Sequence, residues 1–185
     1  GELGEPLERA IQRHAQQRLG ERRVPFYGRF FYPFVAFARL SQALATGTDR
    51  EAALVRLAAA IGEAERRPAH PLHRGFVLLA RAGLQWMRGD PGRALGTLGE
   101  AEDLALKTDN HWLRFEVLRQ QAHALRAGGH GEAGLREARL ALALAEQQGW
   151  PQRGLVLRRE FELAAPAPGR GDPSALKLRR HLDAL

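Results

Sequence analysis

His70 and His73 are spaced as metal ligands on one face of a helix often are. Pro71 lies between them, and no third ligand follows at a suitable spacing. Because zinc sites use three or four protein ligands, we predict no metal site from this pair. The chain contains no cysteine, which excludes disulfides and thiolate metal sites.

Catalytic groups do not converge in this sequence. The carboxylate pairs Glu100 with Glu102, and Glu160 with Glu162, are two positions apart and therefore point away from each other on a helix. The sequence has neither a Walker-type phosphate loop nor a GxSxG motif. The glycine-rich stretch 128–131 fits a turn between helices. We therefore predict a protein that is not an enzyme and needs no cofactor.

Seven of the 13 aromatic residues fall between Phe26 and Phe37. Two interpretations are open: the run packs in the core against the first helix, or it forms an exposed platform for a peptide, a partner helix or a second copy of the chain. Pro33, inside the run, either marks the start of a helix or kinks it. The candidate interface residues are Tyr27, Phe30, Phe31, Tyr32 and Phe34.

The net charge of +7 comes almost entirely from arginine, which is dispersed along the chain. Dispersed charge favours solvated helix faces over a nucleic-acid site. Nucleic-acid binding stays open as a weaker alternative, since Arg22, Arg23, Arg29 and Arg39 flank the aromatic run and could add phosphate contacts to base stacking. No apolar run approaches the roughly 20 residues that span a bilayer. We predict a cytoplasmic protein without a membrane segment.

About nine helices, joined by short connections, are expected. Proline, glycine and capping residues mark their ends. We expect a first helix through Leu19, a second over 29–45 ended by Gly47, and a third opened by a capping box of Thr48 and Glu51. A fourth begins near Pro68 and Pro71, a fifth is opened by Asp90-Pro91, and a sixth is capped by Asp109 or Asn110. A seventh covers 131–148, an eighth begins near Pro151, and a ninth follows Asp172-Pro173 with Leu178, Leu182 and Leu185 on one face.

A Gly-x4-Ala unit recurs three times between these helices. The three pairs are Gly47 with Ala52, Gly89 with Ala94, and Gly128 with Ala133, and the glycines lie 42 and 39 residues apart. Periods of this size are typical of stacked helix hairpins. A second small residue follows seven positions after the alanine in two units (Ala59 and Ala101), and Leu140 stands there in the third.

These units resemble tetratricopeptide repeats, in which a glycine turns the chain between two helices and a small residue lets them pack closely. In these repeats a small residue is also expected early in the first helix of each hairpin. Ala82 occupies this position in the second unit, whereas Leu40 and Gln121 occupy it in the other two. The period near 40 is similar to that of helical sensor regions in large bacterial signalling proteins, such as regulators related to the maltose activator. The resemblance covers about 29–148 and implies a right-handed α-solenoid of antiparallel hairpins.

On this basis we expect one helical-repeat domain over 1–185, with flanking helices at about 5–21 and 150–185. Because the chain starts at Gly1 without an initiator methionine, we expect a piece of a larger regulatory protein. Its expected function is to bind a protein or peptide on a concave surface, and an acidic partner would suit the basic side chains there. A small-molecule sensor walled by Trp86, Trp112 and Phe115 is an alternative, and oligomer formation is a further alternative. The candidate partner contacts are Arg39, Gln42, Arg81, Gln85, Arg114 and Arg126.

Overall fold

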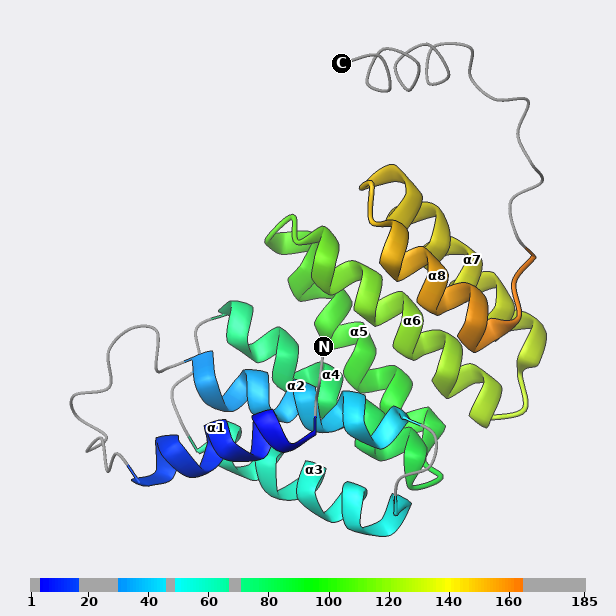
Figure 1. Cartoon of the computed structure of the whole chain (residues 1–185). Coiled ribbons are helices and arrows are strands. Elements are labelled where there is room, and N and C mark those ends of the chain that lie inside the picture. Colours follow the sequence, from blue (N-terminus) through cyan, green and yellow to red (C-terminus); the bar gives the residue numbers. More distant parts are fainter. Residues whose placement is uncertain (1–3, 17–29, 46–48, 67–70, 165–185) are drawn as a thin grey trace, which may run out of the picture.

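The computed structural model describes residues 4–16, 30–45, 49–66 and 71–164, and all regular structure within these ranges is helical (Figure 1). The all-α prediction is confirmed for this part of the chain. The predicted ninth helix lies outside the described residues. The helices are α1 (Glu5–Gln16), α2 (Phe31–Leu44), α3 (Arg50–Glu65), α4 (Pro71–Met87), α5 (Pro91–Lys107), α6 (His111–Ala127), α7 (Gly131–Gln147) and α8 (Pro151–Phe161).

Proline begins several of these helices, as predicted. Pro71, Pro91 and Pro151 are the first residues of α4, α5 and α8. Pro33 lies in the first turn of α2, so it marks the start of that helix and does not kink it. A proline in the first turn costs no helix hydrogen bond, because the first N–H groups of a helix have no partner inside it.

Side-chain caps mark the starts of α3, α5 and α6. Asp49, Asp90 and Asn110 each accept an N–H from the residue three positions on, at 3.3, 3.0 and 3.0 Å. For α6 the cap is Asn110, whereas Asp109 takes the left-handed φ of 49° in the preceding turn. For α3 the prediction was wrong: the cap is Asp49, and Thr48 lies outside the described residues.

Helices α4 to α8 follow a period of twenty residues. They begin at residues 71, 91, 111, 131 and 151, and each of α4 to α7 has 17 residues. Each connecting turn has the same geometry, in which the central residue takes a positive φ and the next N–H donates to a carbonyl five positions earlier. The central residues are Gly89, Asp109, Gly129 and Gly149.

The third Gly-x4-Ala unit was therefore aligned one residue too early. Gly129 takes the φ of +81° that corresponds to +89° at Gly89, while Gly128 has a φ of −80°. Two adjacent glycines hide this register in the sequence, since only their φ angles distinguish them. Gly47, in the first unit, lies outside the described residues.

The close-packing position of the third unit is Gly134 and not Ala133. Gly134 lies forty residues after the buried Ala94, and a Cβ on it would stand 2.8 Å from the carbonyl oxygen of Ala122. Glycine is thus required for α7 to approach α6 this closely. The same forty-residue shift relates buried alanines of α5 and α4 to buried alanines of α7 and α6: Ala101 to Ala141, Ala105 to Ala145, and Ala82 to Ala122.

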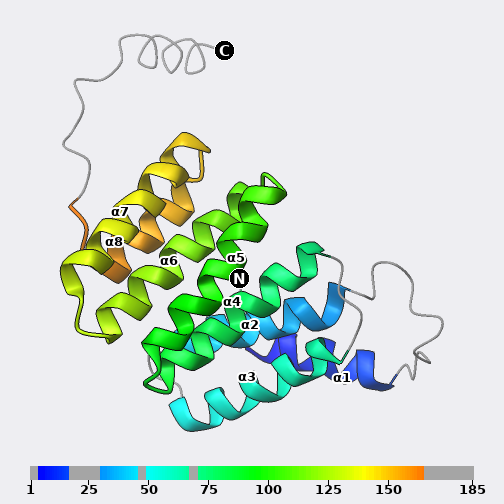
Figure 2. The same ribbon diagram turned by 180° about the vertical axis from the view of Figure 1, so that it is seen from behind.

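The helices form two layers, seen from both sides in Figures 1 and 2. In the first layer α2 contacts α4 and α4 contacts α6, while α3, α5 and α7 each pack against the helices before and after them. Three hydrophobic clusters fill the structure, one within α2–α4, one within α4–α6 and one within α6–α8. Consequently α4 and α6 each bury two faces.

Helix α1 lies beside α2, at the end of the first layer (Figure 1). The Arg39 guanidinium of α2 pairs with the Glu8 carboxylate of α1, and the ring of His14 stacks on Phe31 at a centroid distance of 3.8 Å. Among the described helices, none has the length and apolar character needed to cross a membrane.

Candidate functional site

A row of aromatic rings crosses the first layer from α2 to α6. Phe34 of α2 lies 4.8 Å from Phe76 of α4, and Phe76 lies 4.7 Å from Trp112 of α6, measured between ring centroids. Phe37 contacts both Phe76 and Trp112, at 5.7 and 5.2 Å. We call these four residues the aromatic band. It links three helices that are far apart in the sequence through one continuous set of ring contacts.

The aromatic band reaches the protein surface. Phe34 is 49% exposed, and the other three rings are half-buried. A large apolar side chain with this exposure beside further half-buried rings forms an apolar patch of the kind found at interaction sites. The patch is rigid on one side, because Trp112 and Phe37 also pack against the hydrophobic cluster of α4–α6.

The band lies near the N-terminal ends of its helices, where the electrostatic potential is positive. Phe34, Phe76 and Trp112 are the fourth, sixth and second residues of α2, α4 and α6. The first turns of these three helices carry no acidic residue, so the helix dipoles are not neutralised there. Arg74 and Arg114 are exposed in the same part of α4 and α6. The site therefore combines apolar rings with the positive N-terminal ends of three helices.

Arg153 extends this arrangement to α8. Its guanidinium lies 5.4 Å from the ring of Trp112, 5.1 Å from Phe115 and 5.3 Å from Trp150, within cation–π range of all three. Its Nη1 also donates to the Glu116 carboxylate at 2.7 Å. This cation is satisfied inside the chain, and its main effect is to hold the start of α8 against α6.

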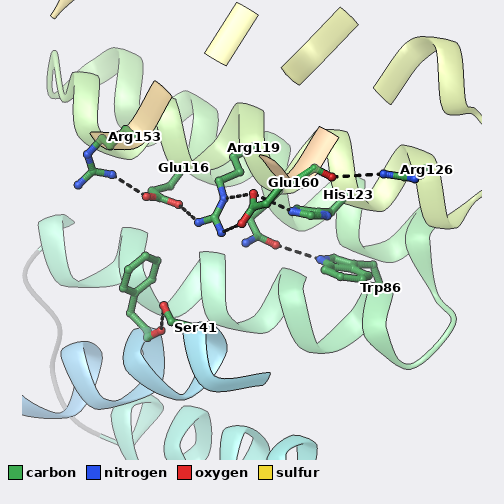
Figure 3. A network of polar contacts seen from close by, with 10 residues as sticks. Ser41, Trp86, Glu116, Arg119, His123, Arg126, Arg153 and Glu160 are labelled. Atoms are coloured by element: carbon green, nitrogen blue, oxygen red, sulfur yellow. Dashed lines mark hydrogen bonds and ion pairs between the residues drawn. The ribbon is translucent and has the colours of Figure 1, made fainter. Parts of the chain in front are cut away.

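An ion-pair network continues from Glu116 along α6 and α8 (Figure 3). Arg119 donates to Glu116 at 3.1 Å and to Glu160 of α8 at 2.7 Å. His123 lies 3.4 Å from the Glu160 carboxylate and stacks on the Trp86 ring, with centroids 5.4 Å apart. The network joins α4, α6 and α8 at the side of the α6–α8 hydrophobic cluster.

The network holds Glu160 ionised. Burial raises the pKa of its carboxyl, but hydrogen bonds from His123 and Arg119, together with their charges, outweigh that effect and lower the pKa to about 2. Burial also lowers the pKa of Arg119, and its bonds with Glu160 and Glu116 outweigh this and raise it. A carboxyl of this pKa does not exchange protons near neutral pH, so the geometry favours a clamp between helices over acid–base chemistry.

The predicted partner contacts on α2 and α4 are engaged within the chain. Arg39 is only 8% exposed, because it pairs with Glu8 and donates to Gln42 at 2.8 Å. Arg81 donates from its Nε to Glu65 of α3 at 3.0 Å. Arg39 and Gln42 thus form one cluster, while Arg81 belongs to another. Their predicted contact with a partner stays a prediction.

The remaining predicted contacts are also separated from one another. Gln85 accepts a hydrogen bond from the Thr97 hydroxyl at 2.9 Å. Arg126, at the C-terminal end of α6, donates to the Glu160 main-chain carbonyl at 3.4 Å. Arg114, near the N-terminal end of α6, is exposed two positions after Trp112 of the aromatic band, a spacing at which two side chains do not face each other on a helix.

The predicted aromatic residues divide between packing and exposure. Phe30 contacts the buried His73 at 3.8 Å, and Phe31 and Tyr32 contact His14 of α1 at 3.8 and 5.4 Å. Phe34 is the one that is largely exposed. Tyr27 lies outside the described residues.

Comparison with known proteins does not place the chain in a family: no family model, curated protein or solved structure matches it significantly. Among the described residues, no group of three or more His, Asp or Glu side chains is arranged to hold a metal ion. The arguments for function therefore rest on the geometry of this chain.

The residues predicted as walls of a small-molecule cavity lie in three different packing environments. Trp86 donates its Nε1 to Gln120 at 2.9 Å, Trp112 belongs to the aromatic band, and Phe115 is buried in the α6–α8 cluster. A pocket of about 900 Å³ does exist, but it lies elsewhere, between α7 and the C-terminal ends of α6 and α8. None of the three predicted walls lines it.

Sequence reasoning missed Phe76 as a band residue and missed the ion-pair network. Glu116 and Arg119 are three positions apart on one helix, a spacing that signals an ion pair and could have been noticed. Glu160 follows 41 positions after Arg119, and no local pattern connects the two.

Proposed function

We propose that this chain is a non-catalytic protein-interaction module, built from helix hairpins of the tetratricopeptide type, that binds a partner protein through its aromatic band. It serves as a docking or sensory part of a larger regulatory protein. The observation that carries the proposal is the exposed Phe34 at the head of a continuous row of rings over three helices.

The repeated architecture supports this proposal. Helices α4 to α8 recur every twenty residues with one turn geometry, and within one layer α2 contacts α4 and α4 contacts α6. Stacked hairpins of this kind present an extended surface made of equivalent positions from successive helices. The aromatic band crosses such a surface at neighbouring, not equivalent, positions, since its rings come from the N-terminal halves of α2, α4 and α6.

The partner expected from this surface is an acidic segment with apolar side chains. Apolar side chains would cover Phe34 and the edges of Phe76 and Trp112. Carboxylates would face the unneutralised N-termini of α2, α4 and α6. Net charge of the whole chain, at +7, adds long-range attraction for an acidic partner.

The same surface is less suited to nucleic acid. Base stacking needs open ring faces, whereas Phe76 is packed between Phe34 and Trp112 at 4.8 and 4.7 Å. Arg74 is paired with Glu100, and Arg153 with Glu116, which reduces the charge available for phosphates. These contacts favour a protein partner.

The experiment is affinity capture from a native lysate, with and without nuclease, by wild type, Phe34→Ser and Val55→Ser. Val55 is the matched control, because it is 56% exposed on α3, away from the band. We expect the same captured proteins with wild type and Val55→Ser, unaffected by nuclease, and their loss with Phe34→Ser. Equal capture by both variants, or capture that nuclease abolishes, would contradict the proposal.

A further inference from the structure

Helix α1 presents one mixed face to the rest of the protein. Its half-buried side chains are Leu7, Glu8, Ile11 and His14, which fall on one side of a helix at spacings of three and four. Most of its other described side chains are exposed. The inward face thus combines two aliphatic residues with a carboxylate and an imidazole ring.

The surface of α2 that contacts α1 provides a partner for the carboxylate and for the imidazole ring of this face. Arg39 binds both oxygens of the Glu8 carboxylate, and its Nη2 donates to Oε2 at 2.9 Å. The ring of Phe31 lies parallel to that of His14, at an interplanar angle of 6°. Tyr32 meets the same imidazole edge-on, at 5.4 Å. The α2 surface therefore recognises a carboxylate and a flat ring about six residues apart on a helix.

Arg39 makes the α2 surface selective for a helix that carries a carboxylate. It is 8% exposed while α1 is in place, so its charge lies in a largely desolvated position. An unpaired cation in such a position destabilises the folded protein, and a carboxylate that accepts hydrogen bonds on both oxygens is its most favourable partner. Consistent with this, the hydrogen bond from Arg39 lowers the pKa of the Glu8 carboxyl. Any helix that replaces α1 must bring its own carboxylate.

Helix α1 is attached differently from the other described helices. It makes fewer close backbone contacts with its neighbours than any of α2 to α8. Fourteen residues separate it from α2, compared with three between successive helices from α4 to α8. Glu8 itself keeps 44% of its side chain exposed, so solvent can reach the ion pair that holds α1. Separation of α1 leaves the contacts among α2, α3 and α4 intact.

We propose that the α2 surface formed by Phe31, Tyr32, Arg39 and Gln42 is a docking site for an amphipathic helix of a partner protein that carries a carboxylate, and that α1 is its internal occupant. A partner helix with the chemistry of α1 binds when α1 leaves. This site is distinct from the aromatic band, so substitution of Phe34 leaves it unchanged, and each proposal can fail without the other.

The test uses the full chain and a labelled peptide of residues 4–16 as the competing helix. Glu8→Gln removes the charge that holds α1, and Glu5→Gln is the matched control, since Glu5 is 77% exposed and faces Arg9 on the same helix. We expect the peptide to bind Glu8→Gln at least tenfold more tightly than wild type or Glu5→Gln, because the site is more often vacant. A peptide that itself carries Glu8→Gln should bind at least fivefold more weakly.

Equal or undetectable binding of the peptide to Glu8→Gln and wild type would overturn the proposal. Amide hydrogen exchange gives a second readout: in Glu8→Gln we expect at least tenfold faster exchange over residues 5–16 and unchanged exchange in α4–α8. If residues 5–16 exchange only together with α4–α8, α1 does not leave separately and the proposal fails. If Glu8→Gln forms a stable dimer by light scattering, the occupant is a second copy of the chain and not a partner helix, which also overturns it.

Discussion

The two halves of the described chain are connected in different ways. From α4 to α8 every connection has three residues and one geometry, whereas the connections before α4 have fourteen, five and five residues. The rings also differ: Phe115 in the regular half is 1% exposed, and Phe34 in the first half is 49% exposed. On the proposed account the regular half supplies the support together with Phe76 and Trp112, and the first half supplies Phe34, the most exposed ring of the band.

Truncation of one ring in each half tests this difference most strongly. We expect Phe115→Ala to lower the free energy of unfolding by about 4 kcal/mol, because the ring is fully buried, and Phe34→Ala by only about 1–2 kcal/mol. Urea denaturation of both variants measures the two values. A cost for Phe34→Ala as large as that for Phe115→Ala would place the exposed end of the band in the core.

The ion-pair network should matter more than an exposed ion pair in the same region. Glu160→Gln leaves Arg119 without its main partner in a nearly buried position, and we expect a loss of about 3 kcal/mol. Glu146→Gln breaks the pair with Arg158 but alters a 58% exposed carboxylate, and should cost less than about 1 kcal/mol. Similar losses in chemical denaturation would show that the network is no stronger than a surface pair.

Acid should weaken the regular half through Glu160. Its pKa is about 2 in the folded protein and 4.5 ordinarily, so its stabilising effect is complete above pH 4.5 and is lost as the pH falls toward 2. Between pH 6 and pH 3 this amounts to about 2 kcal/mol. The stability of Glu160→Gln, measured over the same range, should fall by that much less than wild type. Parallel curves for the two proteins would show that the Glu160 pKa is not lowered.

Two glycine substitutions should have effects of opposite sign. Gly134→Ala places a Cβ 2.8 Å from the Ala122 carbonyl oxygen, and we expect a net loss of about 1–2 kcal/mol. Gly96→Ala on α5 meets no atom within 4 Å, and we expect a gain of up to about 1 kcal/mol from helix propensity. Thermal unfolding of both variants checks the signs. A gain for Gly134→Ala would show that α6 and α7 do not depend on this close approach.

Local signals in the sequence were sufficient for the starts of α4, α5 and α8. Proline at 71, 91 and 151 and caps such as Asp90 act within a few residues, and the predicted starts at these positions are confirmed. The register of the third repeat was not predictable in this way. Gly128 and Gly129 are the same residue type, and packing of the whole α6–α7 hairpin decides which takes the positive φ.

The candidate sites were predicted only where their residues are close in sequence. The concentration of rings in 30–37 pointed to Phe34, but Phe76 and Trp112 meet it only through the packing of α2, α4 and α6. Arg39 was predicted as a partner contact, whereas in the structure it pairs with Glu8 of α1. Its partner, Glu8, is 31 residues away, and helix periodicity holds no information about that pairing.

The most direct test of the aromatic band is site-specific photo-crosslinking. A benzoyl-phenylalanine replaces Phe34 in one protein and Val55, similarly exposed on α3, in the other, and both are irradiated in native lysate. The account predicts a defined set of protein adducts at position 34, resistant to nuclease, and none of these at position 55. Identical adducts at both positions, or adducts at position 34 that consist of nucleic acid, would contradict it.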